Sequence, residues 1–424
     1  MEPEALFHRR KDNPVWNTSY PLSPRDWEAY RTDSPLPFEG ERELSFYVHI
    51  PFCRQLCAFC EYARMLCPSA DRQRAYVDTI GNDIRAFLSR HDDFTLRGFD
   101  IGGGTPTALS AGNLSRLLDI YDEATDGLTL APDYEPSIEG TFRTLTDEKL
   151  RRIAQSGIRR LSLGLQSTSR TVLHHQSRED NPPGLMEAKL ALARRAGITK
   201  INLDLMYGLS SQSIATIEAD LAVVRHLSPE QVTLYELRPN RIHADCPFSK
   251  DELYHHYTIF FDGLSALGYK ARFGQNTFTK DTADEGVSSY LRSRMLEGAS
   301  YKGFGLSAQS MSRQGVSYNV GKIPRPDSAL LARSTFDEQD TYLLPPDELA
   351  AKYIAISAYY GSFSLEHLSD TLSCDAGQHY KVPTTFCLEN GLMERSGDRL
   401  CITREGFRHY GAVFSLFYSP DRKI

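Results

Sequence analysis

Tyr47-Val-His-Ile-Pro-Phe-Cys53-Arg-Gln-Leu-Cys57-Ala-Phe-Cys60-Glu-Tyr62 is the stretch that decides the fold of this chain. It joins a short apolar run, typical of a β-strand, to three cysteines at a C-x3-C-x2-C spacing. A loop of this length can fold three thiolates around one corner of an iron–sulfur cube. Such cubes normally take four cysteines, so one iron would lack a protein ligand. An open metal position is where a substrate or cofactor can bind. The pattern therefore predicts an open cluster on Cys53, Cys57 and Cys60.

Two other interpretations of these cysteines stay open at this point: a zinc knuckle, or three unrelated core thiols. Zinc sites favour C-x2-C pairs with a second ligand pair further along the chain, and no such pair follows in this sequence. The remaining cysteines are scattered, which is typical of a reducing compartment and not of a disulfide framework. They are Cys67, Cys246, Cys374, Cys387 and Cys401.

Length and composition set the broad class of the protein. A chain of 424 residues, 24% charged and 41% hydrophobic, is typical of a globular protein and long enough for two domains. The net charge of −7 argues against a nucleic-acid partner. The first residues lack the layout of a signal peptide, and no apolar run approaches the roughly 18 residues of a membrane span. We therefore expect a cytoplasmic protein without nucleic-acid or membrane partners.

Short apolar runs alternate with helical patterns from residue 45 onward, which predicts βαβ units and a parallel sheet. Six such units fit an α/β fold, a partial (β/α)6 TIM-like barrel, whose active site lies at the carboxyl ends of the strands. The expected strands are residues 45–52, 99–101, 135–139, 160–165, 200–206 and 231–237. The expected helices are residues 71–89, 114–124, 147–155, 185–195, 214–225 and 251–267.

Three segments are expected around this plan. Residues 1–43 are polar and rich in proline, and predict an extended N-terminal arm with a short helix near residues 24–30. Residues 44–343 hold the barrel and an extension. Residues 344–424 predict a small winged-helix-like domain, with Asp347 as a helix N-cap and a hairpin at Ser396-Gly-Asp398. Trp16, Tyr20 and Trp27 suggest that the arm packs against the rest of the protein.

Polar residues recur at the predicted strand ends. Asp100-Ile-Gly-Gly-Gly-Thr105 offers a glycine-rich turn, in which Gly103 and Gly104 let the backbone approach a ligand closely. Beyond it come Glu139, Gln166, Arg178 and Asp204. Each alone is equally explained by a tight turn, a solvent-facing strand end or a structural ion pair. As a set they can bracket one zwitterionic nucleoside, with acids for its amine and ribose and Arg178 for its carboxylate.

The cysteine motif resembles the radical S-adenosylmethionine (SAM) superfamily. More closely, it is similar to the oxygen-independent coproporphyrinogen III oxidases and their relatives, the haem chaperones and the class C radical methyltransferases. The resemblance implies a radical SAM barrel with a 4Fe-4S cluster whose open iron is chelated by SAM. It also implies cleavage of SAM to methionine and a 5′-deoxyadenosyl radical, driven by an electron donor such as flavodoxin or ferredoxin.

The resemblance also implies roles for individual residues. Gly103, Gly104 and Thr105 match the glycine motif that holds the amino group of SAM. The four polar residues at the later strand ends match SAM-binding positions, and Tyr47 matches a tyrosine next to the sulfonium. For Tyr47, a core aromatic is the competing interpretation. His49 is assigned no role.

Tyr62 departs from the oxidases, which carry a cysteine at this position; relatives with other activities carry an aromatic residue. This difference favours a class C type enzyme that uses a second SAM to transfer a methyl or methylene group to a tetrapyrrole or other unsaturated small molecule. The glycine-rich residues 303–310 would form one wall of the second SAM site, or an ordinary turn. Oxidative decarboxylation of coproporphyrinogen III and haem trafficking by a chaperone are the alternatives.

Overall fold

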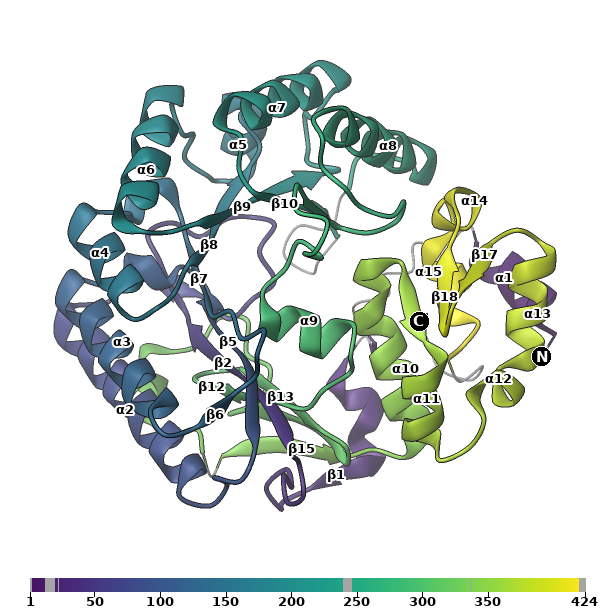
Figure 1. Cartoon of the computed structure of the whole chain (residues 1–424), viewed down its shortest axis with the longest axis horizontal. Coiled ribbons are helices and arrows are strands. Elements are labelled where there is room, and N and C mark those ends of the chain that lie inside the picture. The colour runs from purple at the N-terminus through teal and green to yellow at the C-terminus, as the bar shows by residue number, and fades with distance from the viewer. Residues whose placement is uncertain (1, 12–19, 22, 239–245, 337, 419–424) are drawn as a thin grey trace.

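A single large mixed sheet organises the protein (Figure 1). The computed structural model describes residues 2–11, 20–21, 23–238, 246–336 and 338–418. In spatial order the strands are β1 (Arg31–Thr32), β15 (Gln339–Leu343), β14 (Gly315–Asn319), β13 (Gln309–Ser312), β12 (Tyr301–Phe304), β2 (Glu43–Ile50), β5 (Thr95–Gly103), β7 (Ser137–Gly140), β8 (Arg160–Gln166), β9 (Lys200–Tyr207), β10 (Gln231–Glu236) and β11 (Thr277–Thr279), with β6 (Thr129–Leu130) beside β5.

The six strands from β2 to β10 are parallel and lie side by side in chain order, as the sequence predicts. Helices connect them and form the outer layer seen in Figure 1. These are α2 (Ala70–Leu88), α3 (Ala111–Thr125), α4 (Asp147–Gln155), α5 (Arg170–His175), α6 (Pro183–Ala196) and α7 (Ile214–Leu227), followed by α8 (Lys250–Ala266). The sheet curves without closing, so the expected partial barrel is confirmed.

The sequence does not predict the extension of the sheet beyond β2. Strand β12 pairs with β2 in parallel, and β13, β14, β15 and β1 continue from it in antiparallel pairs. Residues 303–310 belong to the β12–β13 hairpin, and nearly all of them are buried. A side chain at Gly305 would meet the Tyr76 hydroxyl at 2.5 Å. The expected open wall for a second SAM is therefore wrong for this segment.

Alternation along the barrel strands separates an apolar outer face from a polar inner face. Phe46 on β2 and Phe99 on β5 point outward and pack against Phe87 of α2 and Tyr121 of α3. The inward-facing side chains of the same strands include Ser45, Tyr47 and Asp100, and on β8 and β9 they include Ser162, Asn202 and Asp204. The apolar contacts thus lie between sheet and helices, and the interior is left polar.

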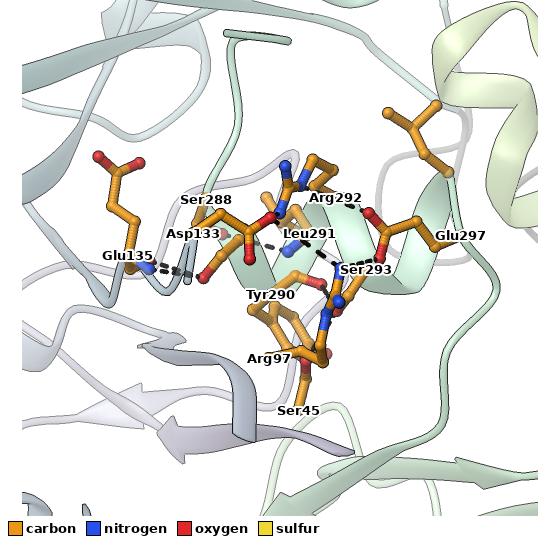
Figure 2. A network of polar contacts seen from close by, with 12 residues as sticks. Ser45, Arg97, Asp133, Glu135, Ser288, Tyr290, Leu291, Arg292, Ser293 and Glu297 are labelled. Carbon is orange, nitrogen blue, oxygen red and sulfur yellow. Dashed lines mark hydrogen bonds and ion pairs between the residues drawn. The ribbon is translucent and has the colours of Figure 1, made fainter. Parts of the chain in front are cut away.

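Helix α9 (Ser289–Met295) lies across the inside of the curved sheet (Figure 1) and is held by polar contacts on several sides (Figure 2). Arg292 pairs with Asp133 and with Glu297, and Arg97 of β5 also reaches Glu297, at 2.7 Å. Deeper in, Ser293 shares a hydrogen bond of 2.7 Å with Ser45. These contacts fix the helix against β2 and β5.

The N-terminal arm packs against the C-terminal part of the chain. It contains α1 (Pro3–Arg10) and the 3-10 helix η2 (Pro24–Tyr30), so it is less extended than expected. The Tyr20 hydroxyl and the Trp27 indole N–H both donate to the buried carboxylate of Glu348, at 2.7 and 2.8 Å. Trp16 lies outside the described residues. The arm is thereby joined to helix α10 (Pro346–Ser357).

The C-terminal part carries a small three-stranded sheet, β16-β18-β17. Its elements are α10, η6 (Ala358–Tyr360), β16 (Ser362–Ser364), α11 (Leu365–Leu372), α12 (Ala376–His379), α13 (Lys381–Glu389), β17 (Met393–Ser396), β18 (Arg399–Ile402), α14 (Arg404–Phe407) and α15 (Tyr410–Ser415). Short helices followed by a hairpin match the winged-helix-like plan. Asp347 is not the N-cap: Pro345 holds that position, because the helix starts at the proline before Asp347.

Domain division at residues 43/44 and 343/344 stays a prediction. In the described part of the chain, no helix is both long and apolar enough to cross a membrane.

Candidate active site

The cysteine loop begins where β2 ends and is fixed by backbone pairing. Strand β3 (Phe52–Cys53) pairs with β4 (Met65–Leu66), and the Cys67 N–H donates to the Cys53 carbonyl at 3.0 Å. Between these strands, the Cys60 N–H donates to the Cys57 carbonyl at 3.4 Å. Cys53 and Cys57 are buried, and Cys60 is partly exposed. The loop therefore holds three thiols at the carboxyl edge of the barrel.

Two arginines place positive charge beside these thiols. Arg178 donates to the Cys57 sulfur at 3.3 Å and also bonds the Gly164 carbonyl at the end of β8. Arg64 is buried, and its guanidinium donates to the Cys57 carbonyl at 2.9 Å. Positive charge of this kind stabilises thiolates, the form in which cysteine binds metal. Arg178 was a sequence candidate, whereas Arg64 was not, because only the folded loop brings it under Cys57.

The glycine motif packs directly against the cysteine loop. The Gly104 N–H donates to the Ile50 carbonyl at 2.8 Å, and the Thr105 hydroxyl lies 3.8 Å from the Cys53 sulfur. A β-carbon at Gly104 would lie 2.9 Å from that sulfur and 2.8 Å from the carbonyl carbon of Pro51. Gly104 is therefore required for this close approach and not merely for a flexible turn.

Three thiols on one loop can each hold a different iron of a cube. Each iron of a cube takes its own thiolate, so the thiols must stand apart while facing one another. Cys53 lies within electrostatic range of both Cys57 and Cys60. Among the described residues, no three His, Cys, Asp or Glu side chains converge on a point that one metal ion could occupy.

Glu139 ends β7 and reaches into the barrel toward the glycine motif. Its carboxylate accepts a hydrogen bond of 3.1 Å from the Gly103 N–H. A β-carbon at Gly102 would lie 2.6 Å from the same carboxylate, so this glycine makes room for it. Enclosure within the barrel raises the pKa of Glu139 to about 8, and the charge of Asp204 adds to this effect. A bound ammonium group would stabilise the ionised form.

Gln166 ends β8 in a strained and incompletely bonded state. Its φ of 69° lies in the left-handed region, which non-glycine residues rarely adopt. Its side-chain oxygen is buried without a hydrogen-bond partner in the structure. Gly164 has no side chain, which leaves room for Gln166 and Arg178. A β-carbon at Gly164 would lie 2.9 Å from the Gln166 side-chain nitrogen and 3.0 Å from the Arg178 guanidinium. An unsatisfied acceptor in a strained residue indicates a ligand contact.

Asp204 lies on β9, inside the barrel. Its carboxylate accepts hydrogen bonds from Ser162 at 3.1 Å and from Asn202 at 2.8 Å. Burial raises the pKa of Asp204, while the positive charge of Arg160 acts in the opposite direction. Asp204 is thus a half-buried acid supported by hydroxyl and amide donors, with acceptor capacity left for a ligand hydroxyl.

Tyr47 and His49 form a chain from the cavity to the cysteine loop. His49 lies 2.8 Å from the Ala63 carbonyl through Nε2 and 3.1 Å from the Tyr47 hydroxyl through Nδ1. Because a carbonyl only accepts, Nε2 carries the proton and Nδ1 accepts from Tyr47. Burial lowers the pKa of His49 to about 4, so it stays neutral near pH 7. His49 therefore orients Tyr47, a role that sequence reasoning missed although both residues share one face of β2.

The site residues thus fall into two neighbouring groups. In the first group, Gly104 and Thr105 lie against Cys53, and Arg178 donates to Cys57. Tyr47, Gly103, Glu139, Gln166 and Asp204 face the barrel interior beside them. Cys60 lies with Cys57 and within electrostatic range of Arg178. The sequence candidates therefore converge on one edge of the sheet, and their individual roles stay predictions.

Comparison with known proteins agrees with this arrangement. The family model described as "Radical SAM superfamily" matches residues 47–223, which span β2 to α7 and hold every site residue named above. The chain carries a radical SAM domain. Such a domain uses a 4Fe-4S cluster together with SAM, and the three thiols with the bracketing polar residues fit this pair of groups.

Two kinds of curated relative resemble the chain. The oxygen-independent coproporphyrinogen III oxidase of Escherichia coli (strain K12) is 34% identical over 225 residues, which cover 51% of this chain and 48% of the relative. The match thus spans about half the length of the oxidase. Heme chaperone HemW of Lactococcus lactis subsp. lactis (strain IL1403) is 25% identical over 396 residues, covering 90% of this chain and 99% of the relative.

A solved structure supports the fold of the whole chain. The coproporphyrinogen III oxidase HemN from Escherichia coli superimposes with a TM-score of 0.73 at 22% identity. The superposition covers 89% of this chain and 91% of that one. The similarity in fold therefore extends beyond the residues that the family model matches.

Substitution of Gly104 tests the packing of the glycine motif on the cysteine loop. Gly104→Ala should lower the iron bound after anaerobic reconstitution to below about half of a full cube of four irons, because the new methyl group displaces Cys53. Gly112→Ala is the matched control, since a β-carbon there meets nothing within 4 Å. Wild-type iron content in a folded Gly104→Ala protein would contradict this packing.

The raised pKa of Glu139 predicts a pH dependence of SAM binding. Below a pKa of about 8 the free carboxyl is protonated and must lose its proton to pair with the ammonium of SAM. Affinity should therefore rise between about pH 6 and about pH 7.5, by up to roughly tenfold per unit. Glu139→Gln should flatten this rise. SAM affinity is measured by equilibrium titration at each pH. If it changes with pH equally in wild type and Glu139→Gln, then Glu139 is not the group whose proton is released on binding.

Proposed function

We propose that this chain is a radical SAM enzyme whose cluster is held by Cys53, Cys57 and Cys60. The observation that carries the proposal is the convergence of three thiols with Arg178 at the edge where the glycine motif, Glu139 and Gln166 also lie. When bound, the cluster supplies the electron that cleaves SAM to methionine and a 5′-deoxyadenosyl radical. The protein residues bind SAM, orient it and shield the radical from water.

Each polar residue has a task that its surroundings support. Arg178 reaches the Cys57 sulfur, so its guanidinium is placed to hold the carboxylate of a SAM that chelates the neighbouring iron. Glu139 and the Gly103 backbone lie together and suit the amino group. Asp204 offers acceptors for ribose hydroxyls. Tyr47, oriented by His49, presents its hydroxyl edge to the sulfonium side of the cavity.

The further reaction proposed here is methyl or methylene transfer from a second SAM. Tyr62 supports it: this side chain is 60% exposed, lies near Glu139, and stands where the oxidases have a cysteine. The overall reaction balances as two SAM, one substrate C–H and two electrons giving the methylated substrate, methionine, 5′-deoxyadenosine and S-adenosylhomocysteine. A small one-electron donor such as flavodoxin or ferredoxin would supply the electrons.

The substrate class in this proposal is a small unsaturated molecule, such as a tetrapyrrole. Three tyrosine rings gather near Glu139: Tyr235 and Tyr359 meet edge-to-face with centroids 6.5 Å apart, and both lie within electrostatic range of Tyr62. Aromatic walls of this kind favour a flat apolar ligand. Tyr359 comes from the C-terminal part of the chain, which therefore contributes to the site as well as packing on it.

Two alternatives have support from relatives. Oxidative decarboxylation of coproporphyrinogen III is favoured by the oxidase relatives, and haem trafficking by the heme chaperone relative that matches along nearly its whole length. A chaperone needs an axial ligand for haem iron. His49, the histidine on β2, uses both ring nitrogens for Tyr47 and Ala63, which makes it unsuitable for that role.

Turnover with SAM labelled at its methyl group separates the three activities. The reconstituted, reduced protein is mixed with labelled SAM and with tetrapyrrole and unsaturated candidates. Methyl transfer predicts labelled product with 5′-deoxyadenosine and S-adenosylhomocysteine in equal amounts, because each turnover consumes one SAM in each way. A Cys53→Ala protein is the control for cluster-independent reactions.

Other product patterns would contradict the methyl transfer. Carbon dioxide and 5′-deoxyadenosine without transferred label indicate the oxidase reaction. Tight haem binding with neither adenosyl product above the Cys53→Ala control indicates a chaperone. Absence of 5′-deoxyadenosine together with absence of haem binding would reject the radical SAM proposal as a whole.

A further inference from the structure

Arg294 of α9 is a half-buried cation inside the curved sheet, and its hydrogen-bond partners are all neutral. Its guanidinium donates to the Tyr290 hydroxyl at 3.2 Å and to the Gln309 side-chain oxygen at 3.3 Å. It also stacks over the Tyr301 ring at 4.7 Å. Its Nε is buried without a hydrogen-bond partner. Within the described ranges, Arg294 forms no ion pair with an aspartate or glutamate.

This arrangement is costly for the folded protein unless an anion completes it. A charge removed from bulk water is destabilising by several kcal/mol when it lacks a counter-charge. Arginine in such a setting normally pairs with a planar two-oxygen anion through its fork of N–H donors. Among the described residues, those around Arg294 provide aromatic faces and hydroxyls but no carboxylate, so a ligand anion would complete the site.

Arg294 also lies where a substrate would lie. Tyr290, its neighbour on α9, stacks on Tyr47 with ring centroids 5.7 Å apart and planes 21° apart. Arg294 is within electrostatic range of both Tyr47 and the exposed Tyr62. The helix is fixed from its other side by Arg292, which pairs with Asp133 and Glu297 (Figure 2). The guanidinium is thus held at the aromatic part of the cavity by a rigid support.

Charges of both signs lie near Tyr62. Glu139 and Asp204 provide acids on β7 and β9, where the amine and ribose of SAM are expected. Arg238 and Arg294 lie within electrostatic range of Tyr62, and Lys322 lies within range of Arg238. Arg238 and Lys322 both lie within electrostatic range of Glu61, so their charge is partly balanced by the protein.

We propose that Arg294 binds a carboxylate of the substrate while the flat unsaturated part of the substrate lies against Tyr62. The inference rests on the proposed radical SAM function and adds the charge of the substrate and the residue that recognises it. A carboxylate suits the site better than a phosphate, because phosphate sites usually gather several backbone N–H donors or a helix N-terminus. Arg294 stands near the C-terminal end of α9, where the helix offers no such donors.

Binding of a matched probe pair tests the proposal directly. The probes are coproporphyrin III, a flat tetracarboxylate, and the same porphyrin with its carboxylates converted to amides. Both are titrated into the reconstituted protein in the presence of SAM, for wild type, Arg294→Gln and Arg85→Gln. The last variant is the control, because it removes an exposed arginine of the outer helix α2 that pairs with Glu123 and does not hold α9.

Wild type should bind the tetracarboxylate more tightly than the amide. Arg294→Gln should lower the affinity for the tetracarboxylate by roughly tenfold to a hundredfold, as expected for a lost charge-assisted contact. The affinity for the amide should stay as in the wild type. Arg85→Gln should keep the wild-type preference. The assignment is overturned if wild type binds both probes equally or neither, if Arg294→Gln keeps full preference, or if millimolar inorganic phosphate competes through Arg294.

SAM affinity, measured in the same samples, keeps this outcome separate from the proposed function. Arg294→Gln should bind SAM as the wild type does, because Arg294 contacts Tyr290, Gln309 and Tyr301 and makes no hydrogen bond to Arg178 or to the glycine motif within the described residues. A wild type that distinguishes the probes but does not bind SAM would reject the radical SAM function and leave the carboxylate site standing. A wild type that binds SAM but not the tetracarboxylate would reject only the site.

Discussion

The parallel register between β2 and β5 is the constraint on which the rest of the site depends. It sets Tyr47 opposite Asp100, His49 opposite Gly102, and Ile50 opposite Gly103. With this register, the Gly104 N–H closes onto Ile50 and the glycine backbone meets the first cysteine. A shift by one residue would exchange the inner and outer faces of the strand. Phe46 would then enter the cavity, and Tyr47 would lie under α2.

A polar barrel interior has an energetic consequence. In many parallel barrels, packed apolar side chains fill the interior. Here carboxylates and guanidinium groups occupy that interior, so apolar surface must be buried in other parts of the molecule. The outer faces of the strands pack on the helices, and the arm adds Tyr20 and Trp27 against Glu348. Desolvation raises the pKa of Glu139 and of Asp204, as is common for acids at binding sites.

Much of the barrel and of the site could be predicted from the sequence because both follow local patterns. Apolar runs alternating with helical patterns indicate the six parallel strands. The spacing of Cys53, Cys57 and Cys60 suffices to indicate an open cluster, and polar residues at strand ends converge because parallel strands share one edge. Asp347 was wrong as an N-cap because a proline before it begins the helix earlier.

Features that depend on contacts distant in sequence could not be predicted. Residues 303–310 read as an open glycine-rich loop, but pairing of β12 with β2 buries them. Arg64 and Arg294 give no local signal in the sequence. Only the folded chain brings Arg64 to the Cys57 carbonyl and surrounds Arg294 with neutral partners. His49 could have been found from its place two residues after Tyr47 on one strand face.

Mössbauer spectroscopy of protein reconstituted with iron-57, recorded with and without SAM, tests the central claim most directly. That claim is a cube with one iron left open for SAM by a three-cysteine loop. The account predicts that SAM changes the signal of a single iron site, about a quarter of the cluster iron in a cube of four. A spectrum that SAM leaves unchanged, in protein shown to bind SAM, would contradict it.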